Sequence, residues 1–104
     1  MKKRKFNFED YLTNIYRQAN GKPLDASTVQ DYLSYCGTGG EWLHSGDDGV
    51  YWIANSQQAL AYEAAVRFEC SKRYADPHSA VRAYNAYREF LEYQENKRAS
   101  RLAA

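Results

Sequence analysis

Ala80-Val-Arg-Ala-Tyr-Asn-Ala-Tyr-Arg-Glu-Phe-Leu-Glu-Tyr93 is the most regularly patterned stretch of the sequence. Its apolar residues recur every three or four positions, as on one buried face of an α-helix. That face carries Val81, Tyr84, Tyr87, Leu91 and Gln94, with Ala80 and Ala83 beside them and Phe90 on its flank. Asp76-Pro77 precedes the stretch, and a capping acid followed by proline is a typical helix start. The pattern predicts a closing helix from Pro77 to about Lys97.

Three further helices are predicted upstream of Pro77. The nearest starts after Asn55 or Ser56 and ends before Pro77, because the residue preceding a proline disfavours the α region. We expect one continuous face on it, formed by Leu60, Ala61, Ala64, Ala65 and Phe68. A helix from Asp25, which can cap the N–H of Thr28, runs to Gly37. Its stripe is Val29, Tyr32, Leu33 and Cys36.

The first helix is expected to begin near Asn7 and to end at Asn20-Gly21. Its stripe is Phe8, Tyr11, Leu12, Ile15 and Tyr16. Four helices with short connections predict an all-α domain, a small orthogonal or bundle-like four-helix arrangement. We expect that domain to span residues 6–96, between a basic N-terminal arm at 1–5 and a frayed basic tail at 97–104.

Residues 37–53 interrupt the helical pattern with five glycines. Val50-Tyr51-Trp52-Ile53 has the composition of a short strand, which could pair with the segment around Trp42 in a β-hairpin at 41–53. An extended loop with its tryptophan in the core fits the same residues equally well.

Length and composition limit the class of protein. The 104 residues suit one domain with one modest core. No apolar run approaches the roughly 18 residues of a membrane span, and no signal-peptide pattern follows the basic start. We therefore expect a cytoplasmic protein without a membrane partner. Cys36 and Cys70 are expected to be buried thiols rather than a disulfide.

Charge is unevenly distributed along the chain. Residues 1–5 carry four positive charges; residues 6–63 hold two basic residues against eight acids; residues 64–104 hold eight against five. Basic ends suit a nucleic-acid partner, whereas the acidic middle suits a basic protein surface. Ten tyrosines fit either a binding surface or filler at half-exposed core positions.

No catalytic constellation is recognisable, and we expect no enzyme activity and no cofactor. The cysteines lie eight residues before His44 and His78. The close spacings of a zinc site are missing, so no metal is expected. Gly37-Thr38-Gly39-Gly40 lacks the lysine of a phosphate-binding loop.

The basic side chains are the strongest candidates for binding. Arginine interleaved with tyrosine is what backbone phosphates and stacked bases require. The candidate nucleic-acid set is Lys2, Lys3, Arg4, Lys5, Arg67, Lys72, Arg73, Arg82 and Arg88. The alternative is a solvated surface, since Arg88–Glu92 and Glu69–Arg73 have the i,i+4 spacing of helical ion pairs.

Two short stretches resemble the core-binding, SAM-like domain of tyrosine recombinases and phage integrases. They are Leu-Asp-Ala-Ser-Thr-Val-Gln-Asp-Tyr-Leu at 24–33 and the closing stretch at 80–93, and Phe8, Tyr11 and Leu12 fit the opening helix of that domain. The resemblance, over about residues 6–94, implies a four-helix domain that clamps duplex DNA. It implies backbone contacts by Thr28, Arg82 and Arg88, without the residues for strand transfer.

These observations lead to two functional hypotheses. The first is a non-enzymatic module that binds nucleic acid or a nucleoprotein complex. The second is a protein inhibitor or adaptor, such as an anti-CRISPR, of the kind phages and mobile elements direct against host defence proteins. Its contact residues would be Glu41, Trp42, Asp47, Asp48 and Tyr51. In either case the small residues Ala61, Ala64 and Ala65 could join two subunits as a homodimer.

Overall fold

A computed structural model describes residues 2–38 and 49–103, with the side chains of residues 4–37 and 49–100. Over these ranges the chain forms helices and no strand, which confirms the all-α class. The helices are α1 (Lys2–Asn14), α2 (Ala26–Thr38), α3 (Ser56–Ala61), α4 (Glu63–Arg73) and α5 (Pro77–Ala103). None of the described helices is both long and apolar enough to cross a membrane.

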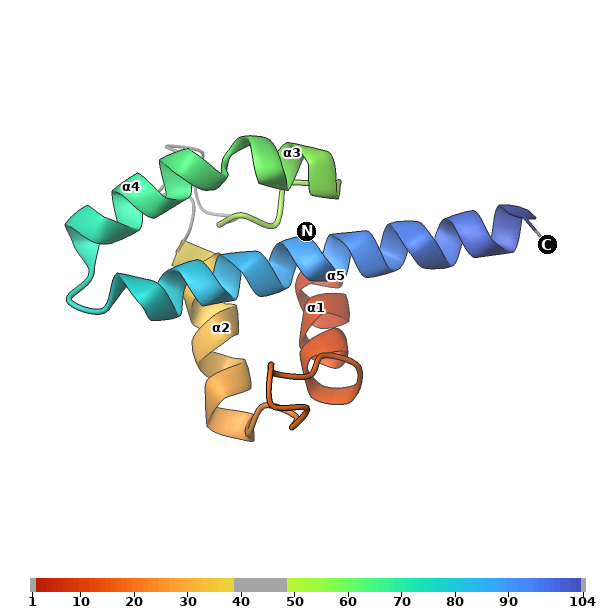
Figure 1. Ribbon diagram of the computed structural model, residues 1–104, viewed down its shortest axis with the longest axis horizontal. Coiled ribbons are helices and arrows are strands. Elements are labelled where there is room, and N and C mark those ends of the chain that lie inside the picture. The colour runs from red at the N-terminus through yellow and green to blue at the C-terminus, as the bar shows by residue number, and fades with distance from the viewer. Residues whose placement is uncertain (1, 39–48, 104) are drawn as a thin grey trace.

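Helix α5 is the axis on which the rest of the molecule is built. Figure 1 shows α3 and α4 along one side of α5 and α1 and α2 crossing its other side, while the C-terminal part of α5 extends past the other helices. Each of the four shorter helices contacts α5, and α1 also contacts α2. The most regular stretch of the sequence is thus the one that all the others pack against.

The predicted apolar face of α5 forms the centre of the core. Tyr84, Tyr87, Phe90 and Leu91 are almost completely buried, and Ala80, Ala83 and Ala86 between them let neighbouring helices approach closely. The ring of Phe8 from α1 packs 5.3 Å from that of Tyr87 and 5.4 Å from that of Phe90, measured between centroids. Such tilted and edge-on ring contacts favour the pairing beyond the area they bury.

Tyrosine hydroxyls form hydrogen bonds that join residues 51–59 to this core. Tyr87 donates to the backbone carbonyl of Ile53 at 2.7 Å, and Tyr84 donates to that of Ala59. Tyr51 donates to the carbonyl of Leu33 at 3.1 Å. Because each buried hydroxyl has an acceptor, these rings can be buried without an unsatisfied polar group. For Tyr84 and Tyr87, the prediction that they are core residues is confirmed.

The start signals at Asp25 and Asn55 are confirmed, but three helix ends differ from the prediction, and one of them is the end of α1, at Asn14 rather than at Asn20-Gly21. The N–H of Thr28 donates to Asp25 at 2.8 Å, and the N–H of Gln58 donates to Asn55 at 2.7 Å. Helix α1 begins at Lys2 rather than near Asn7, so residues 2–5 are helical and form no separate arm. Helix α5 continues to Ala103 rather than ending near Lys97. Asparagine is tolerated inside a helix, so α1 can continue through Asn7. Residues 98–103 contain no glycine or proline, so α5 can continue through them.

The helix expected after Ser56 is split at Tyr62, and its buried face is not the predicted one. Ala59, Val66 and Cys70 face the core, whereas Leu60 and Phe68 are 55% and 63% exposed. Both sets have helical periodicity, so the sequence pattern alone does not choose between them. The packing of α3 and α4 against α5 determines which of the two sets is buried.

Residues 49–53 form a turn and not the strand of a hairpin. Gly49 has φ +60°, Val50 donates its N–H to the carbonyl of Cys36 at 2.9 Å, and Ile53 donates to that of Val50 at 3.0 Å. Trp52 is half-buried against the core, in line with the loop alternative. Residues 41–48 of the predicted hairpin lie outside the described residues.

Candidate functional site

The predicted basic residues of α4 and the middle of α5 lie in ion pairs within their own helices. Arg67 lies 3.3 Å from Glu63, Arg88 lies 3.0 Å from Glu92. Lys72 and Arg73 lie 3.5 and 3.6 Å from Glu69. The predicted Arg88–Glu92 and Glu69–Arg73 pairs are therefore confirmed. With carboxylates beside them, these cations form no unpaired positive stripe.

The basic N-terminus is likewise part of the folded body. Arg4 is half-buried, and its guanidinium donates to the backbone carbonyl of Tyr51. Lys5 is exposed on α1. The side chains of Lys2 and Lys3 lie outside the described ones. Arg4 thus holds the turn at residues 49–53 against α1, a structural role that the sequence analysis missed.

The residues predicted to bind a protein partner include one core residue. Tyr51 is only 4% exposed and its ring packs against those of Phe8 and Tyr87, so its assignment to a binding surface is wrong. Glu41, Trp42, Asp47 and Asp48 lie outside the described residues.

Arg82 differs from the other arginines of this set. It is exposed on α5, and among the described residues no carboxylate forms an ion pair with it. It lines two adjoining hollows of about 430 and 300 Å³ between α2, α5 and the loop that joins α1 to α2. The two hollows share Gln18, Tyr32 and Arg82, and we call them together the Arg82 cleft.

Tyrosines line the same hollows as Arg82. Burial raises the pKa of Tyr16 and of Tyr32, and the positive charge of Arg82 acts in the opposite direction on both. Tyr16 lines the larger hollow, and the half-buried Tyr35 lines the smaller one. The cleft therefore combines a cation with aromatic rings at its walls.

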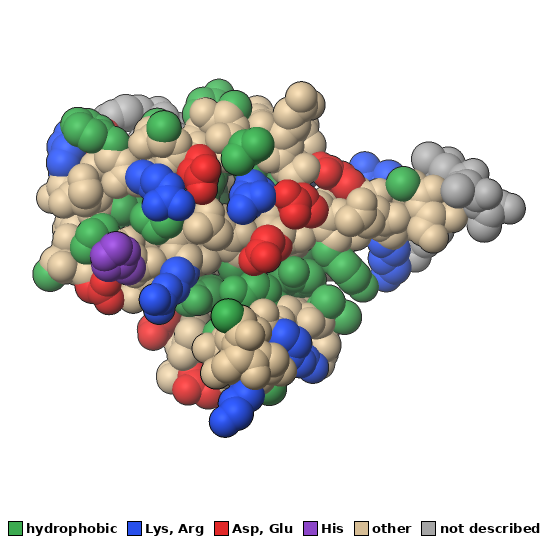
Figure 2. Space-filling view, in the orientation of Figure 1, with side chains coloured by type: hydrophobic (Ala, Val, Ile, Leu, Met, Phe, Trp, Pro, Cys, Tyr) green, Lys and Arg blue, Asp and Glu red, His purple; other side chains and the backbone are tan. Residues whose placement is uncertain are grey.

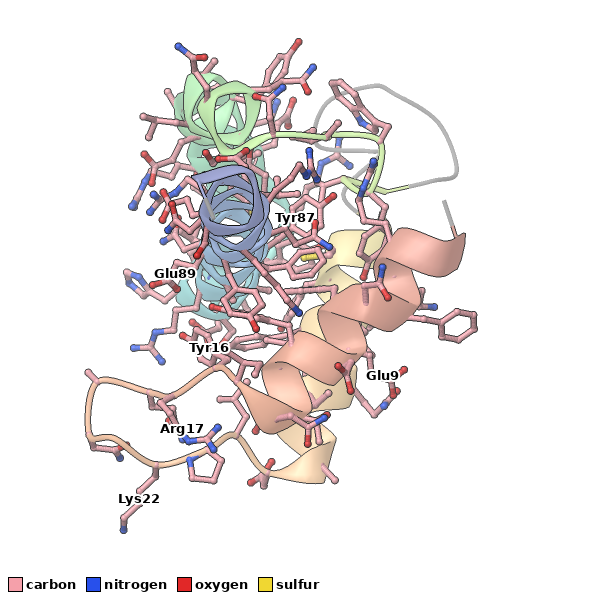
Figure 3. All side chains as sticks on the ribbon, turned by 90° about the vertical axis from the view of Figure 1, so that its right-hand side faces the viewer. Glu9, Tyr16, Arg17, Lys22, Tyr87 and Glu89 are labelled. Atoms are coloured by element: carbon pink, nitrogen blue, oxygen red, sulfur yellow. The ribbon has the colours of Figure 1, made fainter. Side chains whose placement is uncertain are left out.

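The loop between α1 and α2 forms one wall of the cleft and is held by its own hydrogen bonds. Gln18 donates its N–H to the carbonyl of Lys22 at 2.9 Å, and Gly21 donates to that of Gln18 at 2.8 Å. Gly21 has φ +83°, a backbone conformation that glycine adopts at little cost. Figure 3 shows Tyr16, Arg17 and Lys22 on the same side of the molecule as Glu89.

Acidic groups lie close to the cleft as well. Asp31 lines the smaller hollow, and Glu89 raises the pKa of Tyr16 after the larger effect of burial. Asp76 also raises the pKa of Tyr35 after the larger effect of burial, so Asp31, Asp76 and Glu89 balance the three positive charges of Arg17, Lys22 and Arg82. This site can bind an anion, but with modest electrostatic attraction.

The described part of the chain contains neither a cluster of metal ligands nor an exposed thiol. Over residues 2–38 and 49–103, no three His, Cys, Asp or Glu side chains gather as metal ligands. Cys36 and Cys70 are buried free thiols, as predicted, and burial raises the pKa of Cys70 to about 11. A thiol protonated at neutral pH is a poor nucleophile.

Arg82 is one of the predicted nucleic-acid-binding residues, but the prediction did not distinguish it from the other basic residues. The signal was present: Arg67, Arg73 and Arg88 each have a glutamate four residues away, whereas His78 and Ala86 occupy those positions around Arg82. Gln18 and Asn20 line the cleft because the loop between α1 and α2 folds back toward α5, which the sequence pattern does not predict.

No protein family, curated protein or solved structure matches this chain. The resemblance to recombinase core-binding domains stays a prediction.

Proposed function

We propose that the chain is a non-enzymatic binding module for nucleic acid, and that the Arg82 cleft takes up a phosphate and a base of a single strand. The observation that carries this proposal is the Arg82 guanidinium, exposed and without an ion pair among the described residues, beside Tyr16 and Tyr32.

A phosphate fits the chemistry of Arg82. A guanidinium presents N–H donors in a rigid fork that matches two phosphate oxygens. An unpaired arginine offers that fork without first breaking an ion pair. Arg17 and Lys22, exposed on the adjoining loop, would contact the neighbouring phosphates.

The shape of the cleft favours a single strand over a duplex. The two hollows, of about 300 and 430 Å³, fall at the lower end of the volumes typical of small-ligand sites. Volumes of this size suit one nucleotide. Unstacked bases can pack on the Tyr16 and Tyr35 rings, and such stacking contributes about 1–3 kcal/mol per base. The bases of a duplex are already stacked on each other and cannot enter.

Binding of a short fluorescein-labelled oligothymidine, followed by fluorescence anisotropy, tests the proposal. We expect binding that weakens with added salt, and a loss of about tenfold in affinity for Arg82→Gln. Removing one phosphate contact should also reduce the slope of log affinity against log salt by about 0.7. The same oligothymidine paired with its complement should bind more weakly.

Arg67→Gln is the matched control, because Arg67 is also an exposed helical arginine but lies in an ion pair with Glu63. We expect its affinity to stay within about twofold of the parent, as for a solvent-screened pair. Equal losses in the two variants would contradict the site. No binding to either nucleic acid would overturn the proposal in favour of the protein-binding hypothesis, and preferred binding to the duplex would favour the clamp implied by the resemblance.

A further inference from the structure

We infer that the smaller hollow of the Arg82 cleft selects guanine, with the Asp31 carboxylate accepting hydrogen bonds from the N1–H and the exocyclic amine of the base. This inference rests on the proposed function, because it identifies the base that enters the proposed site. The hollow has a volume of about 300 Å³, and its lining includes Thr28, Asp31 and Tyr35 from α2 and Ser79 and Arg82 from α5.

The Asp31 carboxylate differs from the two other aspartates near this hollow. Asp25 accepts a hydrogen bond from the N–H of Thr28 at 2.8 Å, at the start of α2. Asp76 accepts one from the hydroxyl of Ser79 at 2.7 Å, at the start of α5. Asp31 is exposed in the interior of α2, and among the described residues no ion pair or hydrogen bond engages its side chain. Its oxygens are therefore available to a ligand in the hollow.

The two hollows of the cleft differ in charge. Arg82 lines both, whereas Asp31 lines only the smaller one. Among the described residues that line the larger hollow, none is an acid. A phosphate is attracted by a guanidinium and repelled by a carboxylate, so the larger hollow suits the phosphate. The smaller hollow then receives the base, whose donor groups can meet Asp31.

Tyr35 forms an aromatic wall beside the Asp31 carboxylate. The two residues lie four positions apart in α2, so their Cβ atoms are neighbours on one face of the helix, about 5–6 Å apart. Burial raises the pKa of Tyr35, and Asp76 and then Asp31 raise it further. The Tyr35 ring also packs edge-on against that of Tyr74, with the centroids 5.4 Å apart. A base stacked on Tyr35 can therefore place its edge within reach of Asp31.

The hydrogen-bonding groups of the bases favour guanine at this position. An ionised carboxylate offers acceptors only. The Watson–Crick edge of guanine presents adjacent donors, its N1–H and its exocyclic amine, which fit the oxygens of one carboxylate. Adenine and cytosine present a donor beside an acceptor, and thymine and uracil present a donor between carbonyls. Each of these sets a lone pair against the carboxylate, and a polar group left unpaired weakens binding.

Charged groups elsewhere on the surface supply little selection between bases. Over the face drawn in Figure 2, positive and negative side chains are intermingled, and neither sign forms a broad patch. Contacts to phosphates fix the position of a strand but carry no information on its sequence. Selection between bases therefore depends on the groups that line the hollow.

Fluorescence anisotropy of the whole chain with four labelled oligomers tests the inference. Each oligomer is an oligothymidine whose central base is guanine, adenine, cytosine or thymine. The guanine oligomer should bind about tenfold more tightly than the other three, which is the usual size of a bidentate contact to a base. The all-thymine oligomer measures the binding on which the proposed function itself depends.

Asp31→Asn should change the preference between bases and not only the affinity. The asparagine amide presents an acceptor beside a donor, and these match the donor and acceptor of adenine or cytosine. The preference for guanine should fall to within about twofold, or reverse in favour of adenine or cytosine.

Asp10→Asn is the matched control, because Asp10 is also an exposed helical aspartate but lines a different hollow, between α1 and α5. It removes the same charge and should keep the preference of about tenfold for guanine. Loss of the preference in both variants would overturn the inference, since the effect would then come from charge and not from the acceptors of Asp31.

Competition with mononucleotides distinguishes a strand from a free nucleotide. GMP should displace the labelled guanine oligomer at lower concentration than AMP, because its base carries the same donors. It should be at least about tenfold less effective than the unlabelled guanine oligomer, since one nucleotide lacks the neighbouring phosphates. GMP as effective as the oligomer would support the guanine site but overturn the choice of a strand. AMP as effective as GMP would overturn guanine selection.

Guanine selection and the proposed function can fail separately. Equal binding of the four oligomers, together with weaker binding by Arg82→Gln, would overturn guanine selection and support the nucleic-acid module. Lack of binding by all four oligomers would overturn both.

Discussion

Two neighbouring regions of the molecule use aromatic residues in opposite ways. In the junction, where residues 49–59 meet α2 and α5, the rings of Tyr51, Tyr84 and Tyr87 are buried and their hydroxyls donate to backbone carbonyls. On the outer face of α3 and α4, a few residues further along the chain, Tyr62 and Phe68 are exposed.

The difference teaches that buried backbone carbonyls, in the turn at residues 49–53 and in α2 and α3, determine where tyrosine is useful in this core. The carbonyls of Tyr51 and Ile53 lie in a turn that supplies few N–H partners, and the hydroxyl of Tyr87 reaches both, at 3.3 and 2.7 Å. A buried carbonyl without a donor is costly. Phenylalanine could fill the same space but could not satisfy these groups, whereas Phe68 has no such task on the outer face.

The largest effect is expected from breaking the junction at Gly49. An added Cβ would lie 2.0 Å from the carbonyl oxygen of Cys36, and φ is +60°. Gly49→Ala should lower the free energy of unfolding by roughly 3 kcal/mol through steric overlap and backbone strain. Urea unfolding followed by circular dichroism measures it.

Gly21→Ala is the matched control for Gly49. Gly21 also has positive φ, at +83°, but an added Cβ there meets no atom within 4 Å. Only the left-handed backbone penalty of about 1–2 kcal/mol should apply. Equal losses for the two variants would show that packing at the junction contributes nothing.

The second expected effect concerns the hydroxyl of Tyr87. Tyr87→Phe keeps the ring but leaves the carbonyls of Tyr51 and Ile53 without this donor, which should cost about 1–3 kcal/mol of unfolding free energy. Tyr62→Phe, on the outer face, should change it by less than about 0.5 kcal/mol, as is usual at surfaces. Thermal and urea unfolding of both variants would test the contrast, and an unchanged Tyr87→Phe would refute it.

The third expected effect is a loss of stability at alkaline pH. Burial raises the pKa of Tyr51, Tyr84 and Tyr87 above the ordinary value of 10.0. Their stabilising contribution is complete below that value, because each phenol is then protonated whether the chain is folded or unfolded. Above it the unfolded chain releases protons that the folded chain retains, so stability falls as pH rises.

Each of these phenols should contribute a slope of roughly 1.4 kcal/mol per pH unit well above pH 10. Urea unfolding at successive pH values between 8 and about 11 would measure the total slope. In Tyr87→Phe the slope should be shallower by the roughly 1.4 kcal/mol per pH unit that one phenol contributes. A stability that stays level through this range, or an equal slope in the variant, would contradict burial of these hydroxyls.

Much of the fold could be predicted from short-range signals. Asp25 and Asn55 lie three residues before the N–H groups they cap, and the stripe of α5 is visible in a single stretch. The break at Tyr62 and the buried face of α4 could not be predicted, since two periodic sets of residues compete there. The choice depends on the packing of α4 against α5.

The candidate site also has one part that the sequence spacing predicts and one part that it does not. The i,i+4 ion pairs of Arg67, Arg73 and Arg88 follow from spacing alone, because a helix brings such residues together regardless of the rest of the chain. The cleft around Arg82 does not, since its walls come from residues 16–35 and from α5, far apart in the sequence.

By itself, the sequence determined where α2, α3 and α5 start, which face of α5 is buried, and which cations are neutralised by a neighbour one turn away. These properties depend on interactions within a few residues. Only the tertiary structure decided that Arg4 reaches the carbonyl of Tyr51, 47 positions later, and that Phe68 faces outward. Those outcomes depend on how helices pack, which brings together groups that no local pattern connects.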